Sequence, residues 1–186
     1  RSSINSFPIG PRHLFLDSNH TITTFSRASE RPYPWAFMGT LWSSGSRLLA
    51  VSLFLRSHPD GIYFGGSSFG QGVPLPDYRS NILNSVFCLA PEGDRHLDTF
   101  RLWESLSCGS IPLLVDHKSV ASSLLPDDYP IPIFDNWQAA LLFATNCLSN
   151  PTRLDSVQYS VVSWWFKYKS RLHKRLSSSF VAVTHF

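Results

Sequence analysis

The sequence lacks an apolar run long enough to cross a bilayer, since none approaches the roughly 20 residues that a spanning helix needs. It begins with Arg1 rather than Met and shows no signal peptide, which favours a fragment or a processed chain. We therefore expect any membrane anchor of the parent protein to lie outside this chain.

Cysteines are few, and none of the three, Cys88, Cys108 and Cys147, lies in a metal-binding spacing. A structural zinc site is therefore not expected, and an odd number rules out complete internal pairing. We expect buried free thiols. A disulfide between Cys88 and Cys108 is the alternative if the fold brings the two together in an oxidising compartment.

A strong charge of one sign is also missing, because 16 Lys and Arg face 13 Asp and Glu, for a net charge of +3. This excess is too small to indicate a nucleic-acid partner, but it suits an anionic small ligand in a locally positive pocket. Hydrophobic residues make up 43% of the 186 residues, which is enough for one substantial domain with a real core.

The order of apolar runs predicts an α/β domain over residues 33–186, preceded by a lead-in or interdomain linker over residues 1–32. Strands that are apolar throughout and alternate with helices are typical of a parallel sheet covered on both faces. Right-handed crossovers then give a doubly wound, Rossmann-like fold. The expected strands are 34–39, 61–65, 86–90, 111–115 and 131–134, and the expected helices are 45–56, 77–85, 99–108 and 137–148.

Residues 151–178 predict a long final helix with one apolar stripe. That stripe includes Trp164, Tyr168 and Leu172, and we expect part of it to be exposed as an interface with a missing domain. Trp164 and Trp165 would stack on a sugar or, more often for such spacing, belong to the core or to that interface. The basic residues near the helix end are interpreted as a solvated face that favours the helix dipole rather than as a site for an acidic partner.

The segment 85–115 carries the chemistry, because it has the order strand, glycine-bearing loop, helix, turn and strand. The loop after the strand should lie at the carboxyl edge of the sheet, where the next helix presents free N–H groups. Gly93 lets the backbone approach a ligand, and Arg95 and Arg101 add charge suited to phosphate. The segment therefore predicts a diphosphate site.

Glu104 follows Arg101 by three residues, so both should lie on one face of the helix. A partly exposed carboxylate at this place accepts two hydrogen bonds from the vicinal hydroxyls of a ribose. The alternative is a surface ion pair between Arg101 and Glu104, and spacing alone leans toward that pair.

This segment resembles the exostosin family of glycosyltransferases. The family pattern is matched by Ser85, Phe87, Cys88, Leu89, Pro91, Gly93, Thr99, Arg101, Glu104, Ile111 and Pro112. A weaker likeness extends upstream to Phe37-Met38-Gly39 and Arg47 and downstream to 130–148. The resemblance implies the C-terminal half of a GT-B enzyme, in which Gly39, Arg47, Gly93, Arg95, Thr99, Arg101 and Glu104 bind the donor diphosphate and ribose.

Two departures from the family pattern affect these assignments. The loop from Gly93 to Arg101 is one residue longer than in many members, which would shift the phosphate contacts of Asp94 and Arg95. The turn Cys108-Gly109-Ser110 replaces a Gly-Cys turn.

The resemblance implies transfer of a sugar from a nucleoside diphosphate sugar, a UDP-sugar in our interpretation, to a glycan hydroxyl. The partners would be the nucleotide sugar, the glycan acceptor and an N-terminal domain of the parent enzyme that supplies much of the acceptor site and the base of inverting members. No further cofactor is implied, and the location would be the lumen of the Golgi or endoplasmic reticulum. A sequon at Asn19-His20-Thr21 would be usable there.

Two other readings of the sequence compete with the enzyme. One is a non-catalytic nucleotide-sugar-binding or partner-stabilising module derived from such an enzyme. The other is an NAD enzyme, against which the absence of G-x-G-x-x-G after the first strand argues.

Further polar residues are ambiguous. His96 and the pair Asp116-His117 would either contact the donor or serve as an exposed loop residue and a helix cap. The pair Asp127-Asp128 resembles a metal ligand pair, but its neighbours Pro126 and Pro130 favour a surface turn, so no metal is assigned.

Overall fold

The computed structural model describes residues 8–16, 24–41, 45–66, 72–93, 97–116, 124–130 and 133–183, with side chains through residue 178. Arg95, His96, His117 and the sequon at 19–21 lie outside the described residues, so the predictions for them are not addressed by the structure.

Within the described residues, four parallel strands form the sheet, in the order β2-β1-β3-β4. Their bounds are β1 Tyr33–Met38, β2 Ile62–Phe64, β3 Ser85–Leu89 and β4 Ile111–Leu113. Beyond β4, an isolated parallel bridge joins Val115 to Phe134. The doubly wound, Rossmann-like α/β fold predicted from the apolar runs is therefore confirmed. Since β2 lies on one side of β1 and β3 on the other, the chain reverses its direction of travel across the sheet between β1 and β3.

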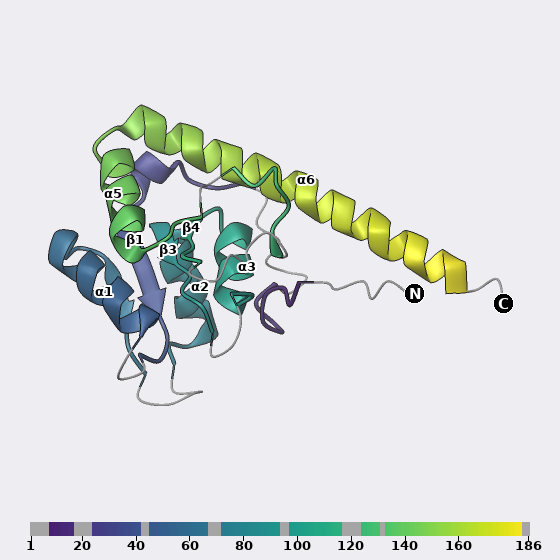
Figure 1. The fold of residues 1–186 in the computed structure, drawn as a ribbon, viewed down its shortest axis with the longest axis horizontal. Coiled ribbons are helices and arrows are strands. Elements are labelled where there is room, and N and C mark those ends of the chain that lie inside the picture. Colours follow the sequence, from purple (N-terminus) through teal and green to yellow (C-terminus); the bar gives the residue numbers. More distant parts are fainter. Residues whose placement is uncertain are drawn as a thin grey trace.

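Helices cover both faces of the sheet (Figure 1). Helices α1 (Ser46–Ser57) and α5 (Trp137–Leu148) cover one face, and α2 (Leu75–Leu83) and α3 (Phe100–Ser107) cover the other. On the first face the ring of Phe54 packs against Trp35 with centroids 5.7 Å apart. On the second, Tyr78 and Ile82 of α2 pack in one cluster with Ala36 and Met38 of β1.

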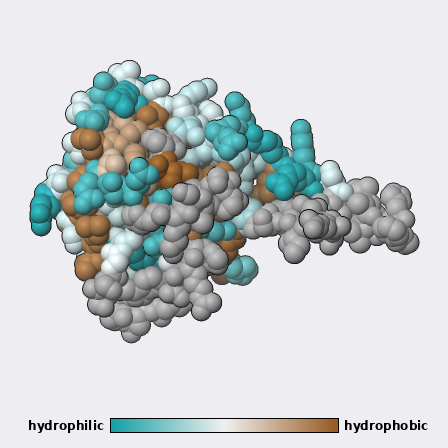
Figure 2. Space-filling model, viewed as in Figure 1, coloured by the Kyte–Doolittle hydropathy of each residue, from teal (hydrophilic) through white to brown (hydrophobic). Residues whose placement is uncertain are grey.

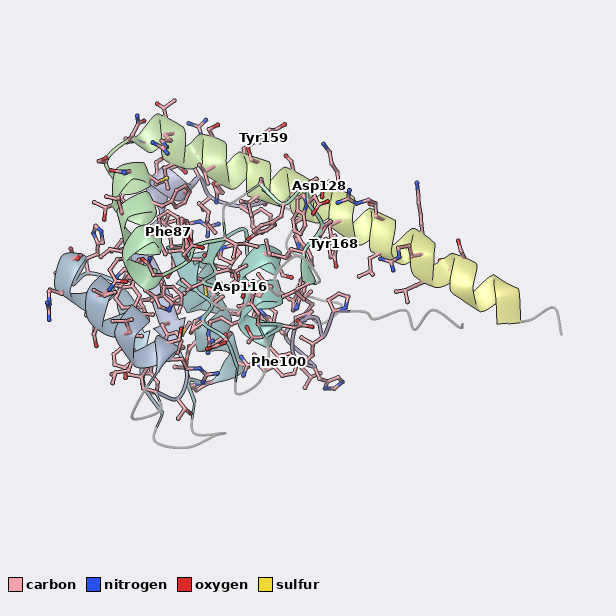
Figure 3. All side chains as sticks on the ribbon, in the orientation of Figure 1. Phe87, Phe100, Asp116, Asp128, Tyr159 and Tyr168 are labelled. Carbon is pink, nitrogen blue, oxygen red and sulfur yellow. The ribbon has the colours of Figure 1, made fainter. Side chains whose placement is uncertain are left out.

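The long helix α6 (Pro151–Val183) crosses the amino edge of the sheet, and its second half projects beyond the rest of the domain (Figure 1). Trp164 and Trp165 are buried, which confirms their place in the core. Tyr168 stacks on Trp103 of α3 with centroids 5.9 Å apart, yet it and Leu172 remain half-buried, so part of the stripe is exposed as expected. Tyr159 and Tyr168 lie on opposite sides of the helix (Figure 3), and Tyr159 is 75% exposed.

The segment before Tyr33 adds to the core. Phe15 is fully buried, and its ring meets Tyr78 edge-on with centroids 6.1 Å apart. Ala28, which opens the short 3-10 helix η1 (Ala28–Glu30), is also buried. The three cysteines are free and buried, in agreement with the expectation of free thiols.

Apolar side chains also reach the surface. On the face drawn in Figure 2 they gather on the side of α1 and α5, where Leu48, Leu49 and Leu142 are exposed. No helix among the described residues has both the length and the apolar character needed to cross a membrane.

Polar side chains close the amino edge of the sheet. The buried Arg31 guanidinium donates to the carbonyls of Ser85 (2.8 Å) and Cys108 (3.1 Å). Gln158 of α6 accepts from the Ala28 amide at 2.8 Å and donates to the Gly109 carbonyl at 3.0 Å. Burial lowers the pKa of Arg31 to about 10, so the group is still charged at neutral pH. These bonds tie β3, α3 and α6 together at that edge.

Candidate functional site

The candidate site lies at the carboxyl edge, where β1 and β3 end side by side. Gly39 follows β1 directly, and its amide donates to the Phe64 carbonyl at 3.0 Å. Gly93 comes four residues after the end of β3. In doubly wound folds ligands bind at the point where the chain reverses direction, so the fold brings these two glycines to the place expected for a ligand.

Arg101 of α3 reaches across to the end of β1. Its Nη2 donates to the Met38 carbonyl at 3.1 Å, and its guanidinium lies 4.4 Å above the Phe37 ring. A Cβ at Gly39 would lie 2.6 Å from that Nη2 atom. Gly39 therefore has a steric reason to lack a side chain, because it leaves room for Arg101. The structure thus brings together two site residues that were predicted from the sequence.

Arg101 makes no ion pair with a carboxylate within the described part of the chain. Its Nε atom is buried and has no hydrogen-bond partner among the residues that the structure describes. The same holds for Oγ1 of Thr99, which precedes α3 at the N-cap position but makes no capping bond. Buried polar atoms are usually paired, so two unpaired ones beside one helix N-terminus indicate a place for an anion.

Arg47 lies at the second position of α1 and links two loops of this edge. Its Nη1 donates to the Thr40 carbonyl at 3.1 Å and its Nε to the Glu92 carbonyl at 3.3 Å. The loops after β1 and β3 are therefore joined through one guanidinium. This contact explains Arg47 as a positioning residue of the edge.

Glu104 differs from the sequence-based expectation. It is 1% exposed rather than partly exposed, and its ion pair is with Arg12 instead of Arg101. Oε1 accepts from Arg12 Nε at 2.7 Å and from the Arg12 amide at 3.3 Å, and Oε2 accepts from the Tyr78 hydroxyl at 2.8 Å. The expected partial exposure and the expected surface pair with Arg101 are therefore both wrong, because Glu104 is a buried acceptor of three bonds.

Sequence reasoning missed Arg12 and Tyr78. Arg12 precedes Glu104 by 92 residues and lies in the segment that was interpreted as a lead-in. Tyr78 is in α2, on the predicted helix 77–85, where an aromatic residue on a buried face is ordinary. The hydroxyl of a buried tyrosine needs a polar partner, so Tyr78 on the buried face of this helix was the one sequence signal for a nearby acceptor.

Burial is the largest influence on the titrating groups of this cluster. Burial raises the pKa of Tyr78 well above its usual range, and the neighbouring Glu104 charge adds to the rise. Burial lowers the pKa of Arg12, but the bond to Glu104 and its charge outweigh this, so the net pKa is raised. Burial also raises the pKa of the Cys88 thiol to about 12, although Arg101 opposes it. Tyr78 and Cys88 are thus neutral at pH 7, and neither is a nucleophile there.

The other polar candidates have contacts of their own. Asp128 pairs with Arg171 at 2.7 Å and accepts from the Trp164 indole at 3.0 Å, so it anchors α6 (Figure 3). The amide of Asp116 donates to the Phe134 carbonyl at 3.0 Å. Within the described ranges, no group of three or more His, Cys, Asp or Glu side chains is placed to hold a metal ion.

Neither the models of known protein families nor the curated proteins include a match to this chain.

Proposed function

We propose that this chain is the donor-binding domain of a glycosyltransferase similar to the exostosin family and that it holds a nucleoside diphosphate sugar, a UDP-sugar above all. The observation that supports this proposal most is Arg101, a cation at the reversal point of the sheet whose described contacts include no carboxylate. The density of family-pattern residues between Ser85 and Pro112 is the second support.

The proposed chemistry is displacement at the anomeric carbon of the donor sugar. The bond from that carbon to the diphosphate oxygen breaks while an acceptor hydroxyl forms the new glycosidic bond. Negative charge then builds on the departing diphosphate, and Arg101 with the N-terminal amides of α3 would stabilise it. The acceptor site, and the base of an inverting reaction, would come from an N-terminal domain of the parent enzyme.

A ribose can bind Glu104 only if a contact of that carboxylate is first broken. A carboxylate offers about four acceptor positions, and Arg12 and Tyr78 occupy three of those on Glu104. A ribose would reach this buried group only after Arg12 withdrew from Oε1. Diphosphate binding at Arg101 has no such requirement.

Calorimetric titration of the chain with UDP tests the proposal. Arg101→Met keeps apolar contact with Phe37 but removes the charge, and UDP affinity should fall about 10- to 100-fold, as for the loss of a hydrogen bond to a charged group. The matched control is Arg56→Met, because Arg56 is exposed at the far end of α1 and should leave the affinity unchanged. Absence of UDP binding by the unaltered chain, or equal affinity for both variants, contradicts the proposal.

A further inference from the structure

The feature that the proposed function leaves unused is the N-terminal segment 8–16, which lies along α3. The Ile9 amide donates to the Asp98 carboxylate at 2.9 Å, next to the N-cap of α3. Further along, Arg79 of α2 donates to the carbonyls of Leu14 and Phe15. Contacts at both ends therefore hold the segment against α2 and α3, with Arg12 between them.

Arg12 is anchored at one end of its side chain and open at the other. Its Nε bonds to Glu104 at 2.7 Å, and its guanidinium carbon lies 4.4 Å from the centre of the Tyr78 ring. The side chain is nevertheless 44% exposed, against 1% for Glu104. Within the described residues its two terminal nitrogens make no bond to a carboxylate.

The position of Arg12 along α3 brings this charge close to the candidate site. Glu104 is the fifth residue of α3, and four residues of helix correspond to about 6 Å along its axis. Because its Nε is held at Glu104, the guanidinium lies about one helical turn from the helix N-terminus. Tyr78 is influenced by the charges of both Arg101 and Glu104, which places all of these groups in one electrostatic neighbourhood.

We infer that Arg12 is a second phosphate-binding residue of this site and that Glu104 is the residue that positions it. This inference rests on the proposed function. The bond from Nε to Glu104 Oε1 and the contact with the Tyr78 ring fix the plane of the guanidinium. Its two terminal nitrogens then face outward as a fork that matches two phosphate oxygens. Arg12, Arg101 and Arg47 together carry one positive charge more than the carboxylates Glu104 and Asp98 of this region, which gives the local positive excess that a diphosphate needs.

The competing arrangement makes Glu104 the direct ribose ligand and Arg12 a group that must be displaced. The two arrangements predict opposite results for Arg12→Met. If Arg12 binds phosphate, its removal weakens UDP binding. If Arg12 blocks Glu104, its removal tightens UDP binding, because no ion pair has to be broken.

The test is calorimetric titration of the chain and of Arg12→Met with uridine, UMP and UDP at low salt, with Arg56→Met as the charge-matched control. We expect UDP affinity of Arg12→Met to fall about tenfold or more, as for a lost charged hydrogen bond, with uridine affinity unchanged. The double variant Arg12→Met/Glu104→Gln guards against a folding defect, because the amide oxygen still accepts from Tyr78 and no buried charge is left unpaired. It should show the same loss for UDP and none for uridine.

Each other outcome overturns a distinct statement. Tighter or unchanged UDP binding by Arg12→Met overturns the inference while the proposed function stands. If the double variant loses affinity equally for uridine and for UDP, Glu104 binds the ribose, and the inference about Arg12 is overturned. Failure of the unaltered chain to bind UDP overturns the proposed function and the inference together.

Discussion

The two edges of the sheet each hold a partly or fully buried arginine, and the two arginines are used differently. At the amino edge Arg31 donates to the carbonyls of Ser85 and Cys108 and, at 3.4 Å, of Ser26. At the carboxyl edge Arg101 donates to the Met38 carbonyl and leaves its buried Nε unpaired. One guanidinium is satisfied by the backbone, while the other retains an unused donor.

The difference separates a structural cation from a candidate binding cation. Burying a charged group costs free energy unless hydrogen bonds replace its hydration, and Arg31 makes those bonds within the fold. Arg101 makes fewer of them, at the edge where a doubly wound fold binds ligands. A phosphate would supply what Arg101 lacks, so changes at the two edges should act on different properties.

The largest expected effect is alkaline unfolding, to which each edge contributes one thiol. Burial raises the pKa values of Cys88 and Cys108 to about 12 in the folded chain, from 9.0. Since the folded pKa is raised, the unfolded chain releases these protons first, and stability present below pH 9 is lost as the pH rises toward 12. Urea denaturation from pH 8 to 11 should show this loss.

A matched pair of variants checks the origin of the alkaline effect. Cys88→Ala and Cys108→Ala should each reduce the pH dependence of unfolding by about one proton per chain. If neither variant changes the slope, burial of the thiols is not the cause.

The next effect is on stability at the amino edge. Arg31→Met should lower the free energy of unfolding by about 3 kcal/mol, because carbonyls of Ser85 and Cys108 lose a charged donor. Affinity of the folded fraction for UDP should not change. A variant of normal stability, measured by urea denaturation at pH 7, would contradict the structural role of Arg31.

A smaller and opposite pattern is expected for Gly39→Ala at the carboxyl edge. The new methyl group would lie 2.6 Å from Arg101 Nη2, and this flexible side-chain end would shift. UDP affinity should fall about tenfold, because the displaced Arg101 would lose one hydrogen bond to the ligand. Stability should change by less than about 1 kcal/mol. Unchanged affinity in calorimetry would show that the position of Arg101 is immaterial to binding.

Thr99→Val should have the smallest effect on folding. The Thr99 hydroxyl oxygen is buried and unpaired, so its replacement by a methyl group should leave stability unchanged or raise it slightly. If this hydroxyl contacts a phosphate, UDP affinity should fall about threefold to tenfold. A clear loss of stability in thermal unfolding would show instead that the hydroxyl is already bonded in the fold.

The sequence predicted the fold better than it predicted the site. The apolar run of β3 and the spacing of apolar residues in α5 are local sequence patterns. They are enough to predict a strand buried on both faces and a helix. Gly39 was named through resemblance and Arg101 from its place in the segment after β3, and their contact depends on the fold that brings α3 to the end of β1. Arg12 was not named, because an ion pair across 92 residues leaves no local pattern in either segment.

The most direct test of the central claim is amide chemical-shift mapping of the chain titrated with UDP. The account predicts progressive shifts at the carboxyl edge, at Gly39, Gly93 and Arg101. It predicts none at the amino edge, at Arg31, Gly109 and Gln158. Shifts confined to the amino edge, or none at saturating UDP, would contradict the claim that the unsatisfied edge is the binding edge.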